Sequence, residues 1–395
     1  MTAEVGDGNR IAFLDVLRGA ALFGILLVNV FSFGADYPAW SGMADQLVWQ
    51  VKHVVFETKF WMLYSLLFGM GFFLQTQSPG YTMARSVRRL SVLMLFGCLH
   101  GLLFEGDILM LYAELGVLLL LLHRLPTKWL LSLGLLLMLS FPLGHLLGGD
   151  RGDEWPADNA AEASAWLAED LMDSPLAVGS FTEVLAYHAA FLPERFWADW
   201  QYPDSGFLVL ACFLVGFCFL RGGWPLLTGL TGRQSAPIVV GLWVLGLSLM
   251  GVESYWAAAV GYAPFERSDA SPMQVLGGDL MYLAATLSLT GAWFASVWCW
   301  VQSAWLAGAR ASIARAGQMS LTGYVSQTLI FTTVFYGYGW GAAFIWSPAQ
   351  VAAFAVVVYA LQVVLCHVWL QRFRRGPLEW LWRCLTYSCW EPMRR

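Results

Sequence analysis

Residues 12–33 read AFLDVLRGAALFGILLVNVFSF, an apolar run in which Asp15, Arg18 and Asn29 are the most polar side chains. A helix needs about 20 largely apolar residues to cross the roughly 30 Å of hydrocarbon in a bilayer. This run is long enough, and the acidic residues before it are unlike the basic start of a signal peptide. We therefore expect a membrane-spanning helix that is not cleaved off.

The composition of the whole chain agrees with a membrane location. Of its 395 residues, 58% are hydrophobic and only 12% are charged, whereas a soluble domain has about 25% charged residues. Lipid must therefore cover much of the outer surface. Apolar runs long enough to span a bilayer occur at about 12–33, 58–76, 88–104, 107–123, 128–148, 204–221, 236–253, 280–302, 319–337 and 348–370.

These runs predict an all-α, polytopic membrane helical bundle of about ten transmembrane helices. A tight turn at 105–107 joins the short third and fourth runs, so a re-entrant hairpin is an alternative for 88–123. Positive charge gathers on the cytoplasmic side of membrane proteins, so we expect both termini in the cytoplasm. In that orientation only five of the 22 basic residues face outward: Lys52, Lys59, Arg151, Arg195 and Arg267.

The chain is expected to form one transmembrane domain over residues 1–395. Its parts are an N-terminal part at 12–148, an outer acidic loop at 149–203 and a C-terminal part at 204–385. The loop is expected to carry an interfacial helix near Phe181–Phe191. The seven cysteines form no CxxC pair, which argues against a zinc site or a disulfide framework. We expect no metal ion and no nucleic acid partner.

Polar side chains of the first run are the first candidates for function, because ionisable groups at membrane depth cost at least a few kcal/mol unless they face protein or water. Asp15, Arg18 and Asn29 fall on one face of a helix, and the first two are spaced for an ion pair. They either anchor the helix at the inner interface or line a functional chamber. For Asn29 the simpler interpretation is a hydrogen bond between helices.

A second polar set comprises His100, Glu105 and Asp107, at the outer end of the third and fourth runs. A neutral imidazole can act as a general base, and a carboxylate can orient it. The simpler interpretation is that His100 caps a turn or bonds a neighbouring helix. Arg89 lies on the same face at the inner end of the run, next to Arg88.

Two further sets complete the candidates. His53 and Lys59 lie near the same outer surface, where a loop histidine is most simply explained as solvated. In the ninth run, Ser320, Tyr324 and Gln327 share one helical face. That face is expected to line either a cavity or a helix interface.

Several motifs resemble the bacterial YeiB family, over a stretch from residue 14 to residue 383. The resemblance implies a multi-pass protein of the bacterial inner membrane, with 204–385 as the YeiB-type part and a C-terminal domain of unknown function 418. The motifs are LDVLRG at 14–19, GILLVN at 24–29, KF at 59–60, FGMG at 68–71, HG at 100–101, GDIL at 106–109, GQMSLT at 317–322 and FRRGPLEWLW at 373–382.

The first run also resembles, more distantly, membrane acyltransferases of the acyltransferase-3 and heparan-glucosaminide acetyltransferase types. The acyltransferase-3 pattern has an Arg, ten residues and then a functional His, and here Asn29 stands at that distance from Arg18. The heparan-glucosaminide type has Asn at this place and takes its His from the next outer loop, where this chain has His53. The resemblance implies acyl transfer, with His100 and His53 as alternative bases.

The first hypothesis is a membrane-bound O- or N-acyltransferase with acyl-CoA as co-substrate and no tightly bound cofactor. Arg18, Arg88 and Arg89, with Asp15 beside them, would meet the phosphates of CoA on the cytoplasmic side. The acceptor, expected to be a glycan or a lipid-linked molecule, would bind near the outer face.

In this hypothesis His100, or else His53, removes the proton of the acceptor and Asp107 orients the imidazole. Asn29 would bind the carbonyl as negative charge develops on it, and Lys59 would line the substrate cavity. The alternative function is a small-solute transporter in which the polar faces of the first and ninth runs line a pathway. A membrane scaffold is a third interpretation.

Overall fold

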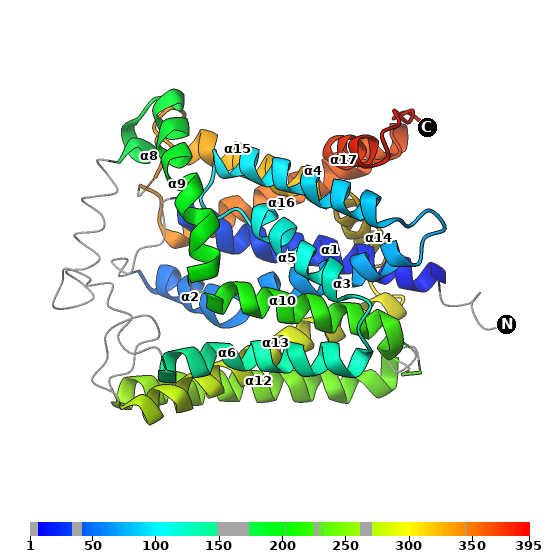
Figure 1. Ribbon diagram of the computed structural model, residues 1–395. Coiled ribbons are helices and arrows are strands. Elements are labelled where there is room, and N and C mark those ends of the chain that lie inside the picture. Colours follow the sequence, from blue (N-terminus) through cyan, green and yellow to red (C-terminus); the bar gives the residue numbers. More distant parts are fainter. Residues whose placement is uncertain are drawn as a thin grey trace.

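The described part of the chain is built from helices, most of which run side by side in one bundle (Figure 1). The computed structural model describes residues 7–33, 42–147, 174–201, 203–224, 229–230, 232–260, 271–343 and 345–395. The prediction of an all-α bundle is confirmed. Residues 149–173 of the expected outer loop lie outside the described residues.

Every one of the ten predicted runs coincides with a helix. The helices are α1 (Asp7–Asn29, extended by η1, Val30–Phe33), α3 (Lys59–Thr76), α4 (Met83–Gly101), α5 (Leu109–Leu122), α6 (Thr127–Leu147), α10 (Pro203–Cys218), α12 (Gly232–Val260), α13 (Pro272–Gln302), α15 (Ser320–Phe335) and α16 (Pro348–Arg372). Shorter elements lie between and beside them: α2 (Met43–Val51), η2 (Lys52–Phe56), α8 (Pro175–Val178), α9 (Phe181–Gln201), η3 (Phe219–Gly223), α14 (Ala307–Gln318) and α17 (Pro377–Tyr387).

Within the described residues, 5 helices are both long and apolar enough to cross a membrane, which supports a membrane-embedded bundle. They lie at Ala12–Phe33, Gly206–Gly223, Gln234–Val260, Pro272–Gln302 and Pro348–Arg372. Helices α5 and α6 are apolar but shorter. The total of ten spans and the cytoplasmic position of the termini stay predictions.

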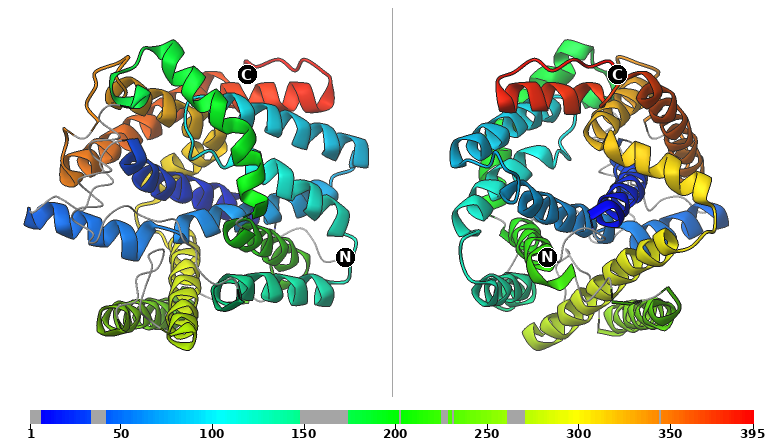
Figure 2. Two further views of the ribbon diagram at one scale, coloured as in Figure 1. Left: turned by 60° about the vertical axis from the view of Figure 1, so that its left-hand side comes forward. Right: turned by 90° about the vertical axis from the view of Figure 1, so that its right-hand side faces the viewer.

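Helix α1, which contains the first apolar run, lies in the interior of the bundle (Figure 2). Phe13, Leu17 and Leu26 are completely buried within it. Its apolar side chains pack against α3, α13, α14, α15 and α16, so α1 contacts elements from both ends of the chain. Helix α12, in contrast, lies at one edge of the bundle and exposes a row of apolar side chains, as expected for contact with lipid.

Helices α3 and α10 pack closely through a reciprocal pair of glycines. A Cβ atom on Gly69 would lie 2.1 Å from the backbone oxygen of Phe213, and one on Gly216 would lie 2.1 Å from that of Leu66. Small residues let helix backbones approach in membranes, where van der Waals packing replaces the hydrophobic effect as the driving force for association. This contact fixes α3, which carries one wall of the cavity described below.

The α3–α10 contact can be tested with Gly216→Ala. We expect the substitution to lower the free energy of unfolding by about 1–3 kcal/mol, because the helices must separate to admit the methyl group. Thermal unfolding of the purified protein in detergent measures the change. Gly241→Ala on α12 is the control, because nothing lies within 4 Å of the added Cβ, and alanine favours helix by up to about 1 kcal/mol. Equal effects of the two substitutions would contradict this packing.

Candidate functional site

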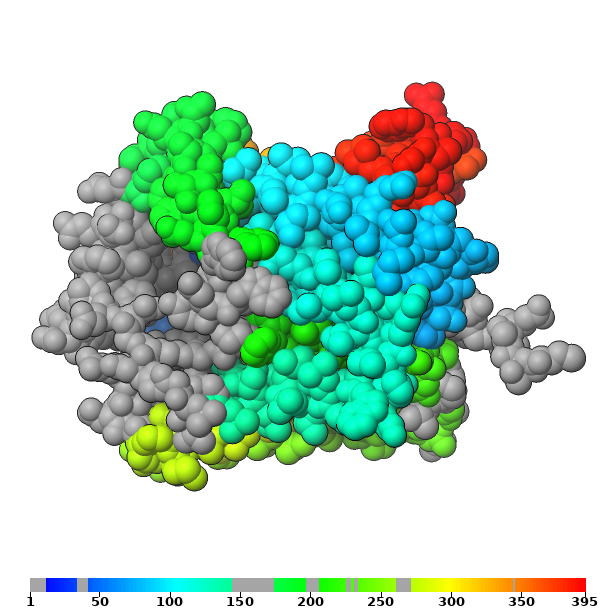
Figure 3. All heavy atoms as spheres, viewed as in Figure 1, coloured from blue at the N-terminus to red at the C-terminus, as the bar shows by residue number. Residues whose placement is uncertain are grey.

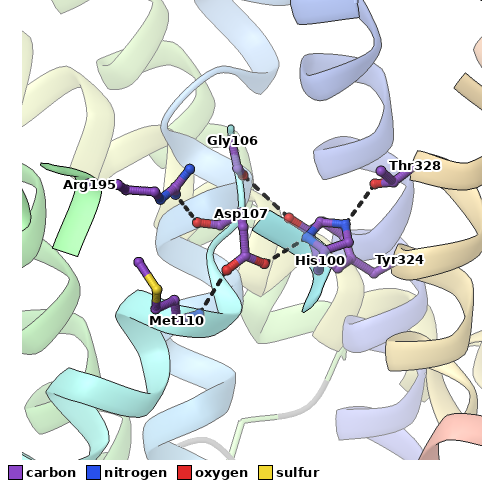
Figure 4. Close-up of polar contacts among 7 residues, drawn as sticks. All are labelled: His100, Gly106, Asp107, Met110, Arg195, Tyr324 and Thr328. Atoms are coloured by element: carbon purple, nitrogen blue, oxygen red, sulfur yellow. Dashed lines mark hydrogen bonds and ion pairs between the residues drawn. The ribbon is translucent and has the colours of Figure 1, made fainter. Parts of the chain in front are cut away.

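His100, at the end of α4, and Asp107, just before α5, form a buried hydrogen-bonded pair (Figure 4). His100 Nδ1 lies 2.7 Å from Asp107 Oδ1, and the two residues are 3% and 1% exposed. On the other side of the ring, His100 Nε2 lies 2.8 Å from Thr328 Oγ1 of α15. In the neutral tautomer that donates its Nδ1–H to the carboxylate, Nε2 carries the lone pair and accepts from the Thr328 hydroxyl.

The turn between α4 and α5 places Asp107 beside His100. The second carboxylate oxygen of Asp107 accepts from the backbone N–H of Met110 at 2.8 Å, which satisfies a free donor in the first turn of α5. Gly97 allows the two helices to meet closely, because a Cβ there would lie 2.5 Å from the Met110 nitrogen. Outside the turn, Arg195 of α9 donates to the backbone oxygen of Asp107.

A cavity of about 490 Å³ lies within the bundle between α1, α3, α4, α5, α15 and α17. Its wall is cationic where it meets α17 and the end of α16, and it becomes apolar toward the α4–α5 turn. The cationic part contains Arg18, Arg89, Arg374, Arg375 and Arg383. The apolar part contains Ile25, Leu67, Phe68, Leu93, Ile108 and Leu109.

Tyr324 connects the cavity with the buried His100. Its side chain lines the cavity, and its ring centroid lies 4.8 Å from that of His100. The Tyr324 hydroxyl donates to the backbone oxygen of Gly106 at 3.4 Å, which is a long and therefore weak hydrogen bond. His100 itself is not a lining residue, so Tyr324 separates it from the cavity.

The carboxylates of the cavity wall are held by other protein groups. Asp15 lies 3.2 Å from the guanidinium of Arg18 and accepts from Gln318 Nε2 at 3.0 Å. Glu379 of α17 accepts from the Thr322 N–H at 2.9 Å and from the Thr322 hydroxyl at 2.6 Å. Burial raises the pKa of Glu379, although the bonds from Thr322 oppose that shift. The arginines therefore dominate the electrostatics of the wall.

Five of the residues predicted from the sequence meet in this cavity, and they come from three different helices, α1, α4 and α15. They are Asp15, Arg18, Arg89, Ser320 and Tyr324. The predicted pair of His100 and Asp107 forms directly behind Tyr324. Asn29 was expected to share a chamber with His100 and Asp107. It is half-buried on α1 and does not line this cavity.

The other predicted residues lie elsewhere. His53 pairs with Glu57 at 2.9 Å near the surface, and Lys59 donates to the His53 backbone oxygen at 3.0 Å. Arg88 bonds the tail after α17, at 2.5 Å from Ser388 Oγ. Gln327 donates to Gln362 of α16 at 2.9 Å, which matches the expected alternative of a helix interface.

Sequence reasoning missed the partner of His100 and much of the cationic wall. Thr328 is a small neutral residue in an already polar helix, so nothing in its spacing singled it out. Arg374, Arg375 and Arg383 belong to the basic C-terminal end, whose charge in the sequence indicates only orientation. Glu379 lies in the FRRGPLEWLW motif, whose mixture of charge and tryptophan was the available signal.

Comparison with known proteins places this chain among bacterial relatives along nearly its whole length. It is 30% identical to YxaH of Bacillus subtilis (strain 168), with 97% of this chain and 96% of the relative covered. It is also 30% identical to YeiB of Escherichia coli (strain K12), with coverages of 94% and 95%. The chain belongs to the YeiB family. A family model described as protein of unknown function (DUF418) matches residues 228–388.

The site of this YeiB-family protein draws on both sides of the DUF418 boundary. Tyr324, Thr328, Arg374, Arg375 and Arg383 lie within the matched residues. Arg18, His100 and Asp107 precede them. A protein from Bacillus acidopullulyticus, described as a 39.9 kDa protein in the amylase 3′ region, is 24% identical over 96% of this chain and 94% of its own length. No solved structure matches the chain significantly.

The His100–Asp107 pair can be tested by a double-mutant cycle with His100→Ala, Asp107→Ala and the double variant. We expect a coupling free energy of about 1–3 kcal/mol, because either single substitution leaves a buried polar partner unsatisfied. Unfolding in detergent, followed by circular dichroism, supplies the four stabilities. The half-exposed pair of His53 and Glu57 is the matched control, with an expected coupling of about 0.2–1 kcal/mol. A buried pair that couples no more strongly than this control would contradict the geometry.

Proposed function

We propose that this YeiB-family protein is an acyltransferase of the bacterial inner membrane. It would move an acyl group from cytoplasmic acyl-CoA to an acceptor near the outer face. The observation that carries the proposal is the polarity of the cavity, which is cationic at one end and apolar at the other, with a histidine–aspartate pair behind the apolar end. A donor with a polyanionic head and an apolar acyl tail matches that gradient.

The cationic end supplies the donor site in this proposal. Guanidinium groups bind phosphate through paired, charge-assisted hydrogen bonds, and five arginines line this part of the wall: Arg18, Arg89, Arg374, Arg375 and Arg383. Arg89 also stacks on Trp382 at 4.3 Å from the ring centroid, so its position is fixed before a ligand arrives. The volume of about 490 Å³ lies in the usual range for a small-molecule site.

The acyl carbonyl would lie at the far end of the cavity, beside Tyr324. An acceptor hydroxyl or amine would take the place of the Thr328 hydroxyl at His100 Nε2 and transfer its proton there. Its oxygen or nitrogen then forms a bond to the thioester carbon, and the carbon–sulfur bond breaks. The departing CoA thiolate takes the proton back from His100, so the imidazole returns to its starting state.

Two neighbouring groups would assist this step. Asp107 holds the Nδ1–H of His100 and stabilises the imidazolium that forms transiently, which is the usual role of a buried carboxylate beside a general base. In this proposal Tyr324 takes the role of carbonyl donor that was expected for Asn29. Tyr324 lines the cavity, and its hydroxyl makes a long and therefore weak bond to the Gly106 backbone oxygen. General-base catalysis of this kind contributes about 10²- to 10⁴-fold in rate.

Binding of the donor tests the proposal. We expect the purified protein in nanodiscs to bind a long-chain acyl-CoA, as measured by isothermal titration calorimetry, and Arg18→Gln to weaken binding by about 10- to 100-fold through loss of charged hydrogen bonds. Arg124→Gln is the matched control, because Arg124 is exposed and does not line the cavity.

Turnover separates acyl transfer from transport. His100→Gln should leave donor binding within about twofold of the wild type while it abolishes CoA release in the presence of acceptor. If no acyl-CoA binds at any accessible concentration, or if Arg18→Gln and Arg124→Gln behave alike, the donor assignment is wrong. Flux of a small solute through proteoliposomes without any CoA ester would favour a transporter instead.

A further inference from the structure

Among the described side chains of helix α9, two buried polar atoms have no hydrogen-bond partner. His188 is 2% exposed, and its Nε2 atom has no hydrogen-bond partner. The Nε atom of Arg195 is also buried and without a hydrogen-bond partner. The two residues are seven positions apart, which places them on one face of the helix. A buried polar group without a partner costs about 1–3 kcal/mol, so two on one face call for a partner from outside the chain.

This face of α9 is turned toward the His100 centre. The Arg195 guanidinium reaches the backbone oxygen of Asp107 (Figure 4). The His188 ring lies 6.3 Å from the ring of Tyr336, at the end of α15. Helix α9 contacts α4 and α5, and a Cβ on Gly101 would already lie 3.0 Å from Leu192 of α9. Arg195 therefore lies against the turn that holds Asp107, and His188 lies beside Tyr336. Neither residue lines the arginine-lined cavity.

The chemistry of the two groups selects a ligand class. Burial, together with the positive charge of Arg195, lowers the pKa of His188 to about 4, so its imidazole is neutral near pH 7. A neutral imidazole bonds a hydroxyl, whereas a guanidinium bonds an anionic oxygen. The two atoms together thus suit a molecule that carries an anionic group close to a hydroxyl.

The position of α9 indicates where such a molecule comes from. Figure 3 shows α9 at the surface beside α4, with α17 at the opposite end of α4. Phe181, Phe191 and Phe196 are exposed on α9, as expected for a helix that lies in the headgroup region of a bilayer. The headgroup region contains phosphates attached to alcohols.

We propose that His188 and Arg195 of α9 form the acceptor site, and that they bind a phosphate-bearing alcohol such as the headgroup of an anionic phospholipid. The inference rests on the proposed acyl transfer, because it supplies the acceptor for the His100 centre. Arg195 holds the phosphate and His188 orients the alcohol. Because Arg195 contacts the Asp107 backbone, the bound molecule lies against the turn that carries the His100–Asp107 pair.

The test uses the full-length protein in phosphatidylcholine nanodiscs with two probes. One is phosphatidylglycerol in the bilayer, and the other is soluble glycerol 3-phosphate. Native mass spectrometry and thermal stabilisation report binding in the absence of any acyl donor. We expect saturable binding that Arg195→Gln weakens by about 10- to 100-fold and that His188→Gln weakens less. Arg195→Lys should keep part of the affinity, and Arg124→Gln, at the far end of α5, should keep all of it.

Saturation by phosphatidylglycerol alone assigns a lipid headgroup, and saturation by glycerol 3-phosphate assigns a soluble phosphate ester. Both support the site. Wild-type affinity in both Arg195→Gln and His188→Gln, or no saturable binding of either probe, would overturn it. Acyl-CoA binding measured on the same samples keeps the two proposals distinct. If acyl-CoA binds but neither probe binds at α9, only the acceptor site is contradicted. If acyl-CoA does not bind, the proposed acyl transfer is contradicted.

Discussion

Asp107 is the point on which the arrangement of this membrane protein depends. Its carboxylate holds both His100 of α4 and the first turn of α5, and its backbone oxygen accepts from Arg195 of α9. A carboxylate this deeply buried is costly unless its oxygens are fully bonded. Meeting that requirement draws α4 and α5 together at one turn, and the bond from Arg195 to the backbone oxygen adds α9. Because His100 reaches on to Thr328, the same turn is also tied to α15 in the C-terminal half.

The end of the cavity that lies beside α17 is positively charged, in contrast to the buried carboxylate of Asp107. There, arginines from α1, α4, α17 and the turn after α16 line one wall, and the two carboxylates of that wall are already bonded to Arg18, Gln318 and Thr322. The wall therefore carries an excess of positive charge that an anionic ligand can neutralise. The apolar part of the cavity extends from the arginines to Tyr324, whose ring packs on His100 at a centroid distance of 4.8 Å. In the proposed acyl transfer, the donor and the acceptor would meet beside Tyr324.

The sequence predicted the helices well, because runs of about 20 apolar residues leave few alternatives in a bilayer. It also predicted the pairing of His100 with Asp107, since ionisable groups at membrane depth need partners and these two flank one turn. Asn29 does not line the cavity described above, because helical periodicity gives a face but not the neighbour of that face. Thr328 was missed for a similar reason: it bonds His100 across 228 residues of sequence, and such a contact has no local signal.

The central claim is that a polyanionic acyl donor occupies the space between the arginines and Tyr324. A cryo-electron microscopy map of the protein in nanodiscs with excess acyl-CoA tests this claim most directly. We expect density for the CoA phosphates beside Arg18 and Arg374. We also expect density for the acyl chain along Leu67 and Leu93 toward Tyr324. A map in which the cavity holds no such density, or in which the ligand binds at another surface, would contradict the account.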